Sequence, residues 1–286
     1  MAVALALLTS IAYGSSNYLG PRLARGAPVF VLLIAGQSCS LALSALVVAG
    51  QGDAVPAGDA VAAALVAGLG NAFGLVLFYR AAATGPLSIV TPIGALGAAV
   101  PVAYGLSQGE SLTALKAAGI VLALGGLALV ARRPSAAAAA AGPPVPKEHD
   151  RRRAVVLALA SAFFFGLFLA AMGPASEDSS GWAVLLSRAS LVVILLAVAL
   201  STGAQLRLPA ARLPLLVIPG ILLFAGTLAY AAATREGDLS VVSVVGSLFP
   251  VVTVGLALGL DRERLSPAQL AGAIATMAGI VALSAR

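Results

Sequence analysis

Ten apolar runs of about twenty residues constrain this chain more than any other feature. A helix of about 20 apolar residues crosses the roughly 30 Å hydrocarbon core of a bilayer. The runs cover residues 2–20, 28–50, 60–79, 87–107, 114–131, 154–173, 181–201, 213–233, 239–259 and 268–284. Only 10% of the 286 residues are charged and 60% are hydrophobic, whereas a soluble domain carries about 25% charged residues. We therefore predict an all-α polytopic membrane protein with ten transmembrane helices.

The last third of the chain is similar to a stretch about 152 residues earlier, which indicates a duplication. Corresponding glycines are Gly94 and Gly246, Gly119 and Gly272, and Gly126 and Gly279. Because each half holds five helices, an odd number, the two halves must cross the bilayer in opposite directions, as inverted repeats do. The predicted domains are a first repeat at 1–131, a flexible linker at 132–152 and a second repeat at 153–286.

The distribution of basic residues predicts the orientation. Most arginines and lysines lie in loops that follow odd-numbered helices, and only Lys116, Arg235 and Arg286 lie on the opposite side. The positive-inside rule places the linker in the cytoplasm and both termini outside. These charges are scattered and have few aromatic neighbours, so the net charge of +6 indicates cytoplasmic loops and no nucleic-acid partner.

Nine polar or aromatic residues at membrane depth are the predicted substrate-binding set. They are Tyr13, Ser16, Asn17, Gln37, Asn71, Tyr79, Arg188, Tyr230 and Ser243. Polar groups within a bilayer need partners from other helices or from water, so each can serve packing or line a cavity. Arg188, which aligns with Gln37, costs roughly 3 kcal/mol on insertion scales. It therefore faces a cavity or a partner, or it extends to the membrane interface.

Prolines and carboxylates give further expectations. Pro92, Pro101 and Pro250 predict kinks in the fourth and ninth helices. Thr113 and Ser266 are expected N-caps, with Pro267 at a first helical position. Glu110 and Glu263 either bind protons or lie near helix N-termini, where negative charge is favoured. The single histidine lies in the linker without the ligands that a metal needs, so no metal site or cofactor is predicted.

These features resemble the drug/metabolite transporter superfamily, in particular its EamA-like branch. The segment from Ala233 to Gly272 is similar to the family's small-Ser run, Pro-Val step, Gly-Glu turn and Gln-x-x-Gly helix start. The run from Tyr13 to Tyr18 is similar to the family's Trp-Gly-Ser-Asn-Phe. Departures from the family pattern are Tyr13 for tryptophan, Gln37 for arginine and Asp261 for glycine. The resemblance implies a secondary transporter, most often an exporter, of an amino acid, metabolite or drug, working by alternating access around a central cavity.

The residues themselves narrow the substrate. No aspartate, glutamate or lysine lies near the middle of any predicted span. A permanently cationic drug is therefore a poorer match than a neutral, zwitterionic or anionic metabolite whose carboxylate meets Arg188.

Two other classes of protein remain as alternatives. A membrane scaffold or receptor that transports nothing shares all of these packing features. A polytopic enzyme needs clustered acids, histidines or nucleophiles, and because the spans lack them we predict no enzyme. The abundance of alanine, glycine and arginine over lysine favours a bacterial source and its plasma membrane. The expected partners are a small solute and the lipid bilayer, and a homodimer is left open.

Overall fold

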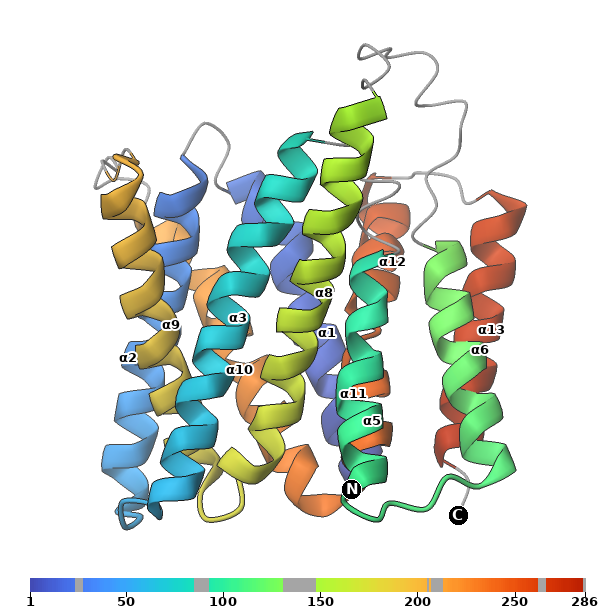
Figure 1. Ribbon diagram of the computed structural model, residues 1–286, viewed down its shortest axis with the longest axis horizontal. Coiled ribbons are helices and arrows are strands. Elements are labelled where there is room, and N and C mark those ends of the chain that lie inside the picture. The colour runs from blue at the N-terminus through green and yellow to red at the C-terminus, as the bar shows by residue number, and fades with distance from the viewer. Residues whose placement is uncertain are drawn as a thin grey trace.

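The computed structural model describes residues 1–23, 28–84, 93–130, 148–204, 206, 213–261 and 266–284 as a bundle of helices (Figure 1). The first half contains α1 (Ala2–Leu23), α2 (Val29–Gln51), α3 (Gly58–Thr84), η1 (Ala95–Ala98), α5 (Ala99–Ser107) and α6 (Ala114–Val130). The second half contains α8 (Glu148–Ala175), α9 (Ser180–Ser201), α10 (Leu213–Glu236), α11 (Leu239–Gly246), α12 (Phe249–Asp261) and α13 (Pro267–Ser284). The 3₁₀ turn η1 runs directly into α5, and only two residues separate α11 from α12. Counting each of these pairs as one helix, the described segments make ten helices.

The two ends of the bundle differ in charge. Figure 1 shows the N- and C-termini at one end, here called the terminus end, while α6 ends and α8 begins at the other, the linker end. The carboxylates whose side chains the structure describes all belong to segments at the terminus end: Asp53, Asp59, Glu110, Glu177, Asp178, Glu236 and Asp238. Described basic side chains at the linker end are Arg80, Arg152 and Arg153. The chain thus begins at the end opposite to the one where α6 ends and α8 begins, and which end faces the cytoplasm stays a prediction.

Two helices are interrupted at corresponding places. The fourth helix begins its described part as the 3₁₀ turn η1, and the ninth is broken between α11 and α12. Pro101 and Pro250 each lie in the first turn of the α-helix that follows, where a missing N–H costs nothing. Pro92, the remaining predicted kink, lies outside the described residues. At the break after α11, the Ser10 hydroxyl donates to the Val245 carbonyl, which supplies a partner within the bundle.

Length and composition alone identify five membrane-crossing helices in the described part of the chain. They are Phe30–Gln51, Gly58–Ala81, Arg152–Ala175, Ser180–Ser201 and Val217–Glu236. Four shorter apolar helices accompany them, two of which are the interrupted fourth and ninth helices. Large hydrophobic side chains such as Leu46, Val156 and Val193 are exposed on the outside of the bundle. In a bilayer these side chains face lipid.

Helix boundaries agree with several local expectations. The Thr113 hydroxyl accepts the Lys116 N–H and so caps α6, and α13 begins at Pro267. Because α8 already begins at Glu148, the last residues of the predicted linker are helical, and 131–147 lies outside the described residues.

The most extensive contacts pair α3 with α8, α6 with α13, and α1 with α10, so that helices of the first half lie along helices of the second. The pair α6 and α13 approaches through glycines. A β-carbon at Gly126 would lie 2.5 Å from the Gly272 carbonyl oxygen, and one at Gly279 would lie 2.7 Å from the Gly119 carbonyl oxygen. Small residues at such crossings let helix backbones come together in a membrane.

The neighbouring glycines Gly125 and Gly126 give a matched test of this contact. Gly126→Ala should lower the free energy of unfolding by about 1–3 kcal/mol, because its methyl group collides with the backbone of α13. At Gly125 nothing lies within 4 Å, so Gly125→Ala should be neutral or stabilising by up to about 1 kcal/mol. Unfolding by detergent titration in mixed micelles measures both. Equal effects of the two substitutions would contradict the close approach.

Candidate functional site

Arg188 is the central residue of the candidate site. It lies eight residues after the start of α9, about 12 Å along the helix at 1.5 Å per residue, and only 2% of it is exposed. Its guanidinium points into the bundle, where Nη1 donates to the Gln37 Oε1 at 2.6 Å. Gln37, on α2, is also buried. An arginine serving the membrane interface would keep its head exposed, so the structure excludes that interpretation.

A third and a fourth helix complete the cluster around Arg188. The Arg188 Nη2 donates to the Thr227 hydroxyl and, at 3.4 Å, to the Leu223 carbonyl, both on α10. Thr227 donates its own hydrogen to the Leu223 carbonyl at 2.8 Å. The Tyr13 hydroxyl, on α1, lies 2.7 Å from the Thr227 oxygen and therefore acts as the donor. Tyr13, Gln37, Arg188 and Thr227 form what we call the arginine cluster.

Tyr230 and Ser243, also predicted for the site, form a separate polar pair. The fully buried Tyr230 hydroxyl donates to the Leu169 carbonyl at 2.9 Å and lies 2.6 Å from the Ser243 hydroxyl. Its ring stacks on Phe168 at 6.3 Å between centroids. This pair joins α8, α10 and α11. Tyr230 lies one turn beyond Thr227 on α10, so the two polar groups are neighbours along one helix.

The remaining predicted residues are more dispersed. The buried Ser16 donates to the Pro219 carbonyl of α10 at 3.3 Å. Asn17 is exposed on α1, Tyr79 is partly buried beside Phe78, and Asn71 is buried on α3. The hydrogen bonds described above thus bring together Tyr13, Gln37 and Arg188 and, separately, Tyr230 and Ser243.

Thr227 was not among the nine predicted residues, although it receives bonds from both Arg188 and Tyr13. A single threonine in an apolar helix usually bonds its own backbone, and Thr227 does so as well. The sequence did hold one signal for Thr227, which is that it lies one helical turn before the predicted site residue Tyr230.

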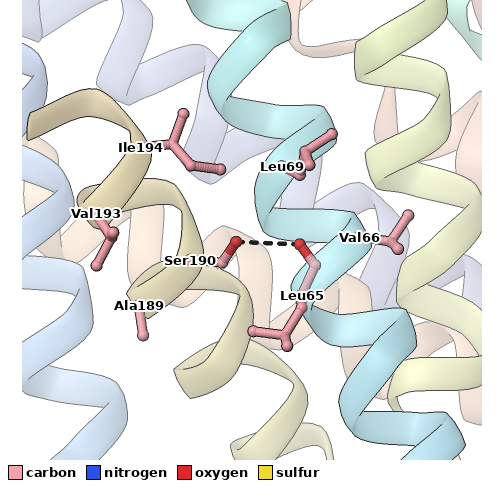
Figure 2. Close-up of a pocket in the computed structure, with 7 residues that line it drawn as sticks. All are labelled: Leu65, Val66, Leu69, Ala189, Ser190, Val193 and Ile194. Atoms are coloured by element: carbon pink, nitrogen blue, oxygen red, sulfur yellow. Dashed lines mark hydrogen bonds between the residues drawn. The ribbon is translucent and has the colours of Figure 1, made fainter. Parts of the chain in front are cut away.

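Neither of the two pockets described here is lined by a predicted substrate-binding residue. The larger, of about 460 Å³, is an apolar groove between α3 and α9 (Figure 2). It is formed by Leu65, Val66, Leu69, Ala189, Ser190, Val193 and Ile194. The Ser190 hydroxyl donates to the Leu65 carbonyl across it at 3.1 Å. With exposed leucine and valine side chains around it, the groove matches the lipid-facing surface of the bundle.

The second pocket, of about 240 Å³, lies at the terminus end and contains Glu110. The Glu110 carboxylate accepts the N–H groups of Leu239 at 2.6 Å and Ser240 at 3.1 Å. Glu110 therefore lies at a helix N-terminus, which was one of the two expectations for it. The helix is α11 of the second half. Beside it, Lys116 forms an ion pair with Asp238. In the part of the chain that the structure describes, no three His, Cys, Asp or Glu residues gather as metal ligands.

Residues 152–285 match the model of the EamA-like transporter family. The second half of the chain is thus similar to the EamA-like transporter family. This family is part of the drug/metabolite transporter superfamily, and the match, together with the apolar helices, indicates a multi-pass membrane protein of the transporter type. No curated protein is similar enough to this chain to count as a match.

A solved crystal structure resembles this chain over almost its whole length. The two share 17% sequence identity with a TM-score of 0.80, over 99% of this chain and 96% of the other. At that identity the likeness shows the fold alone.

Thr227→Val tests the arginine cluster while keeping the size of the side chain. It leaves the Arg188 and Tyr13 donors without their shared acceptor, so the free energy of unfolding should fall by about 2–3 kcal/mol. Thr9→Val is the matched control, because Thr9 is equally buried and its hydroxyl bonds the Leu5 carbonyl of its own helix. The control should cost less than about 1 kcal/mol. A loss for Thr227→Val no greater than for Thr9→Val, by titration in mixed micelles, would contradict the cluster.

Proposed function

We propose that the protein is a secondary transporter that exports a small organic solute across a bacterial plasma membrane by alternating access. The observation that carries this proposal is the arginine cluster: a buried Arg188 bonded to Gln37, the residue at the corresponding position of the first half. Polar residues at membrane depth that face the inside of a bundle mark solute pathways. Sites at the interface of two repeats are typical of secondary transporters.

Repeated contacts support the proposal that the halves are inverted repeats. Gly119 approaches Gly279, and the corresponding pair, Gly272 and Gly126, approaches in the same way. A second pair of corresponding contacts joins α1 with α12, and α8 with the fourth helix. In the first of these, Gly14 contacts Phe249 and Val252, and in the second, Gly166 contacts Gly97 and Val100. Counterparts in the first pair of contacts are 153 residues apart, and those in the second are 152 residues apart. Such an exchange of partners is what a two-fold axis in the membrane plane produces.

The packing suggests which helices move together. Because α3 lies along α8 and α1 lies along α10, neither half is a free-standing body. The fourth helix packs on α8, and the ninth packs on α1. The moving units of the proposed transport cycle are therefore two mixed groups, one with α3, α8 and α5, the other with α1, α10 and α12. The arginine cluster includes α1 and α10 of the second group, together with α2 and α9.

Several bonds hold the two halves together at the terminus end. Ser179 donates to the Asp53 carboxylate at 2.6 Å, and the Trp182 indole donates to the Asp53 carbonyl at 3.1 Å. The Ala57 N–H donates to the Asp178 carboxylate at 3.1 Å. Together with the Glu110 bonds to α11, these contacts support a state closed at the terminus end, which alternating access requires at one point of the cycle.

Solute flux separates a transporter from a scaffold or receptor, which could share the same packing. The purified protein in liposomes should take up at least one labelled member of a panel of amino acids, monocarboxylates, nucleosides and cationic dyes. Uptake should saturate with concentration and exceed uptake by protein-free liposomes. Gly125→Ala, whose site is open, should carry the same solute. Flux no greater than in protein-free liposomes for every compound would contradict the transporter proposal and favour the scaffold.

Two exposed serines test the proposed orientation, with the termini outside. Ser111 lies in the loop before α6 at the terminus end, and Ser201 ends α9 at the linker end. Each is changed to cysteine after Cys39→Ser removes the only natural thiol. Ser111→Cys should react with a membrane-impermeant maleimide in intact cells, and Ser201→Cys only after the membrane is permeabilised. The opposite pattern would show that the termini are cytoplasmic.

A further inference from the structure

We propose that the arginine cluster binds a single carboxylate group of a small solute, which acts as the counterion that Arg188 lacks. The inference deepens the proposed function, on which it rests, by naming the chemical class of the substrate. It begins with charge. The partners of the Arg188 guanidinium are an amide oxygen, a hydroxyl and a backbone carbonyl, all of them neutral. A buried charge without an opposite charge is strongly disfavoured.

Hydrogen-bond donors exceed acceptors in the cluster. A guanidinium offers five N–H groups, and the Tyr13 hydroxyl adds another donor. The acceptors that face them are the Gln37 amide oxygen, the Thr227 hydroxyl and the Leu223 carbonyl. The Arg188 Nε is buried and has no hydrogen-bond partner. A ligand that fits this cluster must therefore bring acceptors and no additional donors.

A carboxylate satisfies both requirements. It accepts hydrogen bonds through two oxygens and matches the planar fork of a guanidinium. Its single negative charge balances the single positive charge of the cluster. An amino-acid zwitterion is a poorer fit, because its ammonium group would need an acidic partner, and the described carboxylates lie at the terminus end. The same reasoning disfavours a cationic solute.

The arrangement also indicates how such a ligand would be held. Arg188 and Tyr13 both donate to one Thr227 oxygen, whose own hydrogen is given to Leu223. A carboxylate oxygen can take the place of the Thr227 oxygen for either donor. Binding would therefore replace a bond that Arg188 of α9 or Tyr13 of α1 makes to α10, so the ligand is coupled to side chains on helices from both halves.

Thermal unfolding of the detergent-purified protein tests the proposal with defined probes. These are benzoate and butyrate, the neutral isosteres benzamide and butyramide, and butylammonium, with ionic strength held constant by potassium chloride. At ten times the dissociation constant, a bound carboxylate should raise the Tm by about 3 °C. The amides and the amine should leave it unchanged. Stabilisation by the amides to the same extent, or by phosphate and chloride alone, would overturn the assignment of a carboxylate.

Variants locate the effect at Arg188. Arg188→Gln should abolish stabilisation by carboxylates, whereas Arg80→Ala, which removes an exposed arginine, should keep it. Because Arg188→Gln removes buried hydrogen bonds that hold α9 to α2 and α10, a second variant, Gln37→Glu, keeps the test independent of folding. It places a carboxylate against the Arg188 Nη1 in nearly the same volume. This variant should unfold at a higher temperature without ligand and no longer respond to carboxylates. The control is Gln51→Glu, the same change at an exposed position of α2, which should respond as the wild type does.

The outcomes separate this inference from the proposed function. Flux of a neutral or cationic solute, with no response to carboxylates, leaves the transporter proposal standing and overturns the carboxylate site. A carboxylate response that depends on Arg188, without flux of any solute, supports the site and contradicts transport. A response that persists in Gln37→Glu would show that the anion binds elsewhere.

Discussion

Hydrocarbon supplies no hydrogen-bond partners, and the structure depends on that constraint. Every backbone group within the membrane must be satisfied by the protein, so the chain crosses as helices. Where a helix is interrupted, the bundle provides the missing partner, as Ser10 does for the Val245 carbonyl. The same rule acts on side chains: the Tyr230 hydroxyl donates to the Leu169 carbonyl, and Ser161 donates to the Gly74 carbonyl of a neighbouring helix. Apolar attraction between helices is weak in lipid, so these bonds and the glycine contacts determine which helices meet.

The arginine cluster is an exception, because it places a charge without an opposite charge inside the bundle. Gln37 and Arg188 occupy corresponding positions in the two halves, yet one is neutral and the other charged. Two identical arginines at such a place would repel each other, whereas two glutamines would leave the site without charge. One of each gives a site with a single positive charge, held between α2 and α9. Its stability must come from the surrounding bundle, because neutral hydrogen bonds compensate a buried charge only in part.

Much of the fold could be predicted from the sequence, because apolar runs and loop charges report directly on the bilayer. The described helices begin and end within a few residues of the predicted runs, apart from longer ends such as those of α3 and α8. The candidate site was less accessible. Alignment of the repeats related Arg188 to Gln37, but it could not show that they touch. Thr227 was missed and Asn17 proved exposed, since a helix that is apolar nearly all round does not reveal which face is buried.

The separation of charge along the bundle bears on the rate at which charged solutes encounter each end. Among the side chains that the structure describes, seven carboxylates lie at the terminus end beside Lys116 and Arg235, whereas Arg80, Arg152 and Arg153 lie at the linker end. Charges of this kind attract an anion to the linker end and repel it from the terminus end, which would make its rate of encounter differ between the two ends. This asymmetry leaves the equilibrium across the membrane unchanged. For a protein with the proposed carboxylate site, anions would reach one end faster than the other, and raised ionic strength would weaken that difference.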